Sequence, residues 1–225
     1  MAKRGAAVRV SPLWKTAREW LDENVEPKYS PLHVPALIPF TNKSLARGAI
    51  TKVSGVRSSG RTGMCLHILA QATQRGEVCA IVDLHNTFAP GSAHAAGVRL
   101  ERLLWVRCHG NGEHAMRAAD LLLHAGGFGV VLLDLCDASP RIANRIPLSY
   151  WFRFQRAIQN TPTILLVCGD RSYAQACSST AVEMEARQFC WSGNPPFLLL
   201  QGIKSNVTVM NGNDRPSTAS MQSVA

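Results

Sequence analysis

The sequence has few acidic residues and no apolar run long enough to cross a membrane. Its 225 residues include 24 Lys and Arg but only 15 Asp and Glu, which gives a formal net charge of +9. A bilayer-spanning helix needs roughly 20 consecutive apolar residues, and the N-terminal stretch lacks the apolar segment of a secretory signal. We therefore expect a cytoplasmic protein without a membrane partner, whose positive charge favours an acidic partner such as nucleic acid.

Paired metal-ligand motifs are also missing. The seven cysteines are scattered without a CxxC spacing, and several lie in apolar runs, where a thiol behaves as a small hydrophobic group. An odd, scattered set argues against a disulfide framework and a zinc site, and it favours a reducing compartment. The histidines show no ligand-like pairing either, so the sequence predicts no metal site.

Apolar runs alternate with helical patterns through the middle of the chain. The runs predict strands over 49–54, 78–82, 103–106, 130–133 and 163–167. Apolar residues at helical spacing predict helices over 62–75, 113–124 and 150–160. Continuous apolar strands separated by helices imply an α/β fold with a mostly parallel sheet that helices cover on both faces. Further strands over 181–191, 197–201 and 206–210, with turns between them, predict antiparallel strands at the C-terminal edge.

The two ends of the chain differ from this core in composition. Residues 1–45 are expected to form a basic arm, a short helix and a proline-rich linker. Trp14 and Trp20 lie on one face of that helix, which either packs on this protein's own core or docks on another chain. Residues 46–210 are expected to form the core domain, and the polar residues 211–225 are expected to be disordered.

The stretch Gly55–Thr62 has the spacing of a P-loop between a strand and a helix. Backbone N–H groups in such a loop surround phosphates, and the helix N-terminus adds its dipole. Arg61 stands where a P-loop has lysine, and the planar guanidinium is not a conservative replacement at so tight a position. Asp134 ends the apolar run 130–133 and would hold the Mg²⁺ water shell beside Thr62. The candidate nucleotide-binding residues are Gly55, Ser58, Ser59, Gly60, Arg61, Thr62 and Asp134.

Hydrolysis also needs a base near the γ-phosphate. After the strand that ends at Asp83 the chain reads Leu84-His85-Asn86, so it offers no glutamate there. His85 is the one substitute base, although an ordinary polar role is favoured for it. We therefore predict no catalytic residue and weak or lost ATPase activity. Whether ATP and Mg²⁺ still bind, or no cofactor binds at all, stays open.

Four arginines lie close together in a stretch without acidic residues. The candidate DNA-binding residues are Arg141, Arg145, Arg153 and Arg156, and the aromatic residues beside them are Tyr150, Trp151, Phe152 and Phe154. Arginines on phosphates and aromatic rings under bases are typical of single-strand binding. In the alternative interpretation, the aromatic residues belong to the core of the 150–160 helix and the arginines form its solvated face.

These motifs resemble, in order and spacing, the core of the RecA recombinase family over residues 46–210. The matching segments are 55–62, 79–83, 89–90 with 95–98, and 130–134. The resemblance implies a RecA-like P-loop fold and ATP-dependent filaments on single-stranded DNA. The chain departs from the family at four positions, where it has Arg61, His85, Ala89 and Asp170 in place of lysine, glutamate, aspartate and glutamine.

The segments 145–154 and 159–163 are similar to the ImuA-type accessory proteins of bacterial SOS mutagenesis. That resemblance implies a protein that works with a Y-family polymerase and an error-prone replicative-type polymerase in translesion DNA synthesis. We expect it to act by binding DNA, RecA or a translesion polymerase subunit rather than by ATP turnover. Two alternatives stay open. One is an active DNA-dependent ATPase of the RecA type, and the other is a cell-division inhibitor of the SulA type.

Overall fold

The computed structural model describes residue 32 and residues 45–143, 145–170, 177–211 and 216–224. Leu32 and Leu45 are buried and pair in an isolated antiparallel bridge. The predicted N-terminal helix, with Trp14 and Trp20, lies outside the described residues. None of the helices in the described ranges has the length and apolarity that a bilayer crossing requires.

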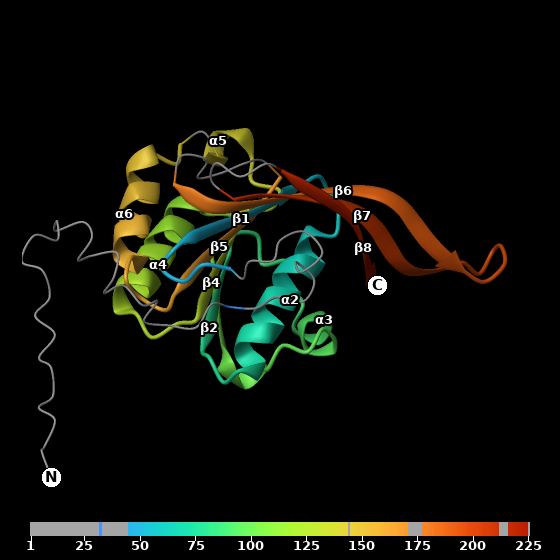
Figure 1. Cartoon of the computed structure of the whole chain (residues 1–225), viewed down its shortest axis with the longest axis horizontal. Coiled ribbons are helices and arrows are strands. Elements are labelled where there is room, and N and C mark those ends of the chain that lie inside the picture. The colour runs from blue at the N-terminus through green and yellow to red at the C-terminus, as the bar shows by residue number, and fades with distance from the viewer. Residues whose placement is uncertain (1–31, 33–44, 144, 171–176, 212–215, 225) are drawn as a thin grey trace, which may run out of the picture.

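Eight strands form one sheet in the order β3-β2-β4-β5-β1-β6-β7-β8 (Figure 1). Their bounds are β1 Ile50–Gly55, β2 Cys79–Asp83, β3 Leu103–Arg107, β4 Val130–Asp134, β5 Ile164–Gly169, β6 Ser178–Ser192, β7 Leu199–Asn211 and β8 Ser217–Val224. All pairings from β3 to β6 are parallel, whereas β6–β7 and β7–β8 are antiparallel. The predicted fold class, a mostly parallel sheet with antiparallel strands at the C-terminal edge, is therefore confirmed.

Helices cover both faces of the parallel part of the sheet (Figure 1). They are α2 Arg61–Gln74, α3 Pro90–Ala95, the 3₁₀ turn η2 Leu100–Arg102, α4 Gly112–Ala125, α5 Pro140–Ala143 and α6 Leu148–Ile158. One buried cluster joins α2 and α3 to the sheet, and a second joins α4 and α6 to its other face. Successive residues of β4 enter opposite clusters, Leu132 the first and Leu133 the second. A strand between two helical layers must therefore be apolar at every position.

The C-terminal strands differ from the predicted ones. β7 runs unbroken through Lys204 and Ser205, where the sequence suggested a turn, because buried Ser205 reaches the loop before α2. β8 lies in the tail for which disorder was expected, and its backbone pairs with β7 from residue 217 to residue 224. Polar composition did not prevent this pairing, because an exposed edge strand needs only backbone hydrogen bonds and cross-strand contacts such as Thr208 to Thr218.

The outer halves of β6 and β7 extend beyond the body of the molecule as a curved two-stranded arm (Figure 1). We call residues 187–201 the arm. It carries large apolar side chains that are exposed to solvent, namely Phe189, Trp191, Phe197, Leu198 and Leu199.

Candidate functional site

The loop Gly55–Thr62 leads from β1 directly into α2. It turns sharply, with a hydrogen bond of 3.2 Å from the Ser59 N–H to the Val56 carbonyl and positive φ angles at Ser58 (60°) and Gly60 (90°). Gly55 has no room for a side chain, because a Cβ there would lie 2.5 Å from the Met184 carbonyl oxygen. The strand, loop and helix expected for a P-loop are thus present, with both glycines at positions that require glycine.

The loop is tied to the antiparallel edge of the sheet. Ser59 is fully buried, and its carbonyl accepts a hydrogen bond of 2.8 Å from the hydroxyl of Ser205 on β7. The Ser59 Oγ lies in the interior without a hydrogen-bond partner among the described residues. One of the predicted phosphate-binding residues is therefore part of the packing beneath the loop.

The guanidinium of Arg61 turns back onto the protein. It donates a hydrogen bond to the Gly55 carbonyl, forms an ion pair with Asp170 and lies 3.6 Å from the carboxylate of Asp137. Burial disfavours its charge, but nearby Cys136, Asp170 and Cys168 raise the pKa of Arg61 overall. The arginine thus stays charged, and the protein's own carboxylates balance that charge.

A second arginine of the loop is also paired. Arg57 donates a hydrogen bond of 2.8 Å to Asp137, and this bond lowers the pKa of the aspartate. The two cations of the loop therefore face two carboxylates, those of Asp137 and Asp170. The pairs carry no net positive charge that could attract an added phosphate. Sequence analysis singled out Asp170 only as a departure from a family pattern. Its contact with Arg61 could not be read from a separation of more than 100 residues.

A cavity of about 260 Å³ lies beside the loop. Its polar lining consists mainly of Arg61, Thr62, Thr87, Ser92, Asp134 and Asp137. The structure therefore brings Thr62 and Asp134 to one cavity, as the predicted Mg²⁺ pair requires. His85, the one substitute base in the sequence, is not part of the lining.

Asp134 is the acidic group at the end of β4. Its Oδ1 accepts a hydrogen bond of 2.9 Å from the Cys136 N–H. Burial raises the pKa of Asp134. Hydrogen bonds from Cys136 and the positive charge of the nearby Arg61 guanidinium lower it, but they oppose the effect of burial only in part. A buried carboxylate that ionises with difficulty is stabilised by a cation placed next to it.

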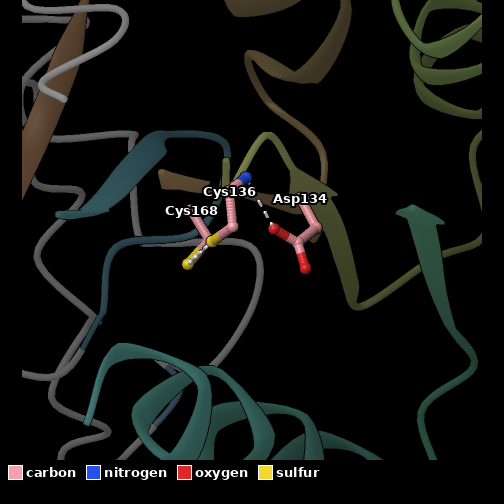
Figure 2. Close-up of side chains that lie close together, drawn as sticks. All are labelled: Asp134, Cys136 and Cys168. Atoms are coloured by element: carbon pink, nitrogen blue, oxygen red, sulfur yellow. Dashed lines mark hydrogen bonds between the residues drawn. The ribbon is translucent and has the colours of Figure 1, made fainter. Parts of the chain in front are cut away.

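Three thiols gather around Asp134, and this cluster was missed in the sequence. Figure 2 shows the side chains of Asp134, Cys136 and Cys168 together, with one possible ligand atom from each within 4.8 Å of the others. The two sulfur atoms are 3.3 Å apart. Cys65 from α2 forms a hydrogen bond to Cys168 as well. No linear spacing predicts this set, because the cysteines come from three elements that meet only in the folded sheet.

The environment of Cys136 and Cys168 keeps these two thiols protonated in the absence of a ligand. The hydrogen bond with Cys168, together with burial, raises the pKa of Cys136. For Cys168 the bond with Cys136 acts to lower the pKa, but the bond with Cys65 and burial outweigh it and raise the pKa. The thiols are thus unreactive unless a positive charge arrives among them.

Asp83 and His85 take structural positions. The buried carboxylate of Asp83 accepts hydrogen bonds from the Thr87 and Phe88 N–H groups and from the indole of Trp105, at 3.1, 2.9 and 3.2 Å. It therefore fixes the loop after β2. His85 lies against Gly110, and its Nε2 is buried without a hydrogen-bond partner in the described part of the chain.

The four candidate DNA-binding arginines define a basic segment, residues 141–156, which lies on α5, on α6 and on residues 145–147 before α6. All four arginines of the segment are exposed: Arg141, Arg145, Arg153 and Arg156. Trp151 and Phe154 are buried against the sheet, so the core interpretation holds for these two rings. Tyr150 and Arg145 line a second cavity, of about 630 Å³, at the start of α4. Arg153 forms an ion pair of 2.6 Å with Asp120.

Comparison with known proteins points to one class. Residues 39–143 match the family model described as RecA N-terminal domain. The chain is 40% identical over 90 residues to Protein RecA of Rhodospirillum rubrum. These 90 residues make up 40% of this chain and 24% of that protein. It is 37% identical over 90 residues to Protein RecA of Laribacter hongkongensis, and this alignment covers 40% of this chain and 25% of that protein.

The chain thus spans about a quarter of the length of the curated relatives it matches. The matched region contains β1 to β4, and with them the loop, Thr62 and Asp134. In sequence this region is similar to the RecA N-terminal domain.

Proposed function

We propose that this protein is a RecA-related accessory protein of SOS-induced translesion DNA synthesis. It binds DNA, RecA or translesion polymerase subunits, and its ATPase activity is lost or weak. The observation that carries the proposal is the inward fold of Arg61 onto Gly55 and Asp170. The guanidinium that takes the place of the P-loop lysine is therefore already paired with groups of the protein itself.

Two features of the site support loss of turnover. A nucleotide's phosphates would have to displace Asp170 and Asp137 from the loop arginines, and each displaced carboxylate would then repel the phosphates. In addition, the cavity beside Thr62 and Asp134 holds no histidine or glutamate among its lining residues. Asp83, the register partner of Asp134 on the neighbouring strand β2, is engaged with three N–H donors.

The exposed basic segment supports binding to single-stranded DNA. Arg141, Arg145 and Arg156 project into solvent and have no ion pair within the described ranges. Phe152 beside them is half exposed. Cations that reach phosphates and a ring that can stack on a base are the two components of sequence-tolerant strand binding. The relatives called Protein RecA favour DNA or a RecA-type partner over an unrelated one.

A DNA-dependent ATPase is the second candidate, because Thr62 and Asp134 share a cavity. Phosphate release measured with ATP, Mg²⁺ and single-stranded DNA separates the two. We expect no turnover above the background of an Asp134→Ala variant. Turnover by the native protein that falls to background in Asp134→Ala would contradict the proposal.

Binding to DNA is tested by titrating a fluorescent oligonucleotide at several salt concentrations. We expect affinity to fall steeply with salt, because each neutralised phosphate releases counterions. Arg141→Ala with Arg145→Ala should reduce the slope of log affinity against log salt by about 1.4, since each single-strand contact contributes about 0.7. The charge-matched control is Arg99→Ala with Arg187→Ala, which removes two exposed arginines outside the basic segment. An equal effect of both pairs would exclude a role of the segment in DNA binding.

Protein partners are tested by a pull-down with RecA, translesion polymerase subunits and the cell-division GTPase. We expect retention of RecA or a polymerase subunit. Retention of the division GTPase alone would favour the SulA-type alternative instead.

A further inference from the structure

We propose that Asp134, Cys136 and Cys168 form a binding site for a soft divalent metal ion of the Zn²⁺ class, at the carboxyl edge of β4 and β5 (Figure 2). The site does not depend on the proposed function, because it uses neither the basic segment nor a nucleotide. It would place a metal held by thiolates in the cavity where Thr62 and Asp134 would otherwise hold Mg²⁺.

The distances between the donor atoms fit a tetrahedral zinc ion. Zn–S bonds of about 2.3 Å and Zn–O bonds of about 2.1 Å separate neighbouring ligand atoms by roughly 3.6–3.8 Å. In the structure the two sulfur atoms are 3.3 Å apart, and all three donor atoms lie within 4.8 Å of one another. Side-chain rotations that shift the donor atoms by about 1 Å or less therefore bring them to ligand distance.

The backbone holds the donors in place before any metal arrives. Asp134 and Cys168 are register partners on adjacent parallel strands. Cys136 is kept beside them by two hydrogen bonds, from its own N–H to Asp134 Oδ1 and from the Leu135 N–H to the Cys168 carbonyl, both 2.9 Å. Cys65 of α2, which forms a hydrogen bond to Cys168, is a candidate for a fourth donor.

Charge balance also favours a cation here. A divalent metal with two thiolates and one carboxylate carries a net charge of −1. The buried guanidinium of Arg61 interacts electrostatically with both Cys136 and Cys168, and it therefore stabilises the negative charge of such a complex. Binding replaces two thiol protons with the metal, Zn²⁺ + 2 RSH + RCOO⁻ giving the complex and 2 H⁺, and the affinity should rise with pH.

The experiment uses the full chain, reduced and freed of metal, with Co²⁺ as a spectroscopic probe for the zinc position. We expect one equivalent of Co²⁺ to produce thiolate-to-metal charge-transfer absorption and the visible bands of a tetrahedral complex, and Zn²⁺ to abolish both. Cys168→Ser and Cys136→Ser should each weaken binding by at least about a hundredfold, since even loss of an outer partner of a ligand costs roughly 10–100-fold. The control Cys190→Ser, which removes a thiol on β6, should leave the spectrum unchanged.

A second measurement needs no variant, which matters if a substitution at the buried Cys168 prevents folding. Native mass spectrometry of the full chain after Zn²⁺ addition should show one bound zinc ion and the loss of two protons, because both thiols are deprotonated when they bind the metal. Three results would overturn the proposal. They are a native protein without thiolate absorption on Co²⁺ addition, Co²⁺ binding that survives both serine substitutions, and a Cys136–Cys168 disulfide in protein purified without oxidant.

Discussion

The parallel half of the sheet and the arm are parts of one sheet with opposite surroundings. β2 and β5 are buried along their whole length, between α2 on one face and α4 and α6 on the other. In the arm, Trp191 is 57% exposed and Phe197 is 84% exposed. Side-chain burial holds the parallel half together, whereas the arm is held by the backbone pairing of β6 with β7.

The difference shows which apolar residues serve folding. An apolar residue in β4 is removed from water on folding, and each buried leucine-sized side chain contributes roughly 1.5–3 kcal/mol. An exposed ring at the arm gains almost nothing in this way. Within the part of the chain that the structure describes nothing covers these rings, and a row of exposed rings is typical of an interaction surface.

The largest effect is expected from truncation in the parallel half. Leu133 is fully buried in the cluster beneath α4 and α6. Leu133→Ala should lower the free energy of unfolding by about 2–5 kcal/mol, because it removes buried apolar surface and leaves a cavity. The measurement is urea unfolding followed by circular dichroism. Leu148→Ala, at a leucine that is 65% exposed, is the matched control, and a similar loss at both sites would contradict the comparison.

The next effect concerns a polar contact inside the same half. Arg47 pairs with Glu77 at 2.6 Å and donates hydrogen bonds to the carbonyls of Gly129 and Pro162. It thereby joins the segments that precede β1, β2, β4 and β5. Arg47→Met should cost about 1–3 kcal/mol, because acceptors lose their donor where water has little access.

The control for this substitution is an arginine on the surface. Arg153 is largely exposed and pairs with Asp120, and an exposed pair contributes only about 0–1 kcal/mol. Arg153→Met should therefore lie within that range in the same unfolding assay. Equal losses for Arg47→Met and Arg153→Met would mean that the Arg47 contacts are no stronger than a surface ion pair.

A smaller effect, of opposite sign, is expected at Asp134. Burial raises the pKa of this carboxyl in the folded protein, so folding binds a proton between the unfolded and the folded pKa. The stability that this proton contributes is present below about pH 4 and is lost as the pH rises through the folded pKa. In a metal-free buffer with chelator, Asp134→Asn should be more stable than the native protein at neutral pH, and the gain should shrink toward pH 4. A gain that does not change with pH would show that ionisation of Asp134 is not its cause.

Much of the parallel half could be predicted because its signals are local. The apolar runs at 78–82 and 130–133 became β2 and β4, since a strand buried on both faces must be apolar throughout. The glycines of the loop marked the passage from β1 to α2. The exposed C-terminal edge has no such signal. There β7 continues through Ser205, and β8 forms in a polar tail, because of pairing with distant residues.

The chemistry of the site was predictable only where one segment carries it. Thr62 and Asp134 were expected near each other because each follows or ends a strand of the sheet. The pairing of Arg61 with Asp170, and that of Cys136 with Cys168, depend on the β4–β5 register and on a loop beyond β5. Neither leaves a spacing pattern in the sequence, and scattered cysteines gave the opposite expectation of no metal site.

The smallest effect is expected at the tip of the arm. Phe197→Ala should change the free energy of unfolding by less than about 0.5 kcal/mol, since surface substitutions away from special contacts rarely do more. Phe154→Ala, at a fully buried ring of α6, should cost about 3–5 kcal/mol in the same assay. The two variants should be compared at low and at high protein concentration. A loss for Phe197→Ala that exceeds about 1 kcal/mol and grows with concentration would mean that the arm is buried between copies of the chain, because association adds stability by mass action. The arm would then be stabilised by side-chain burial, as the parallel half is.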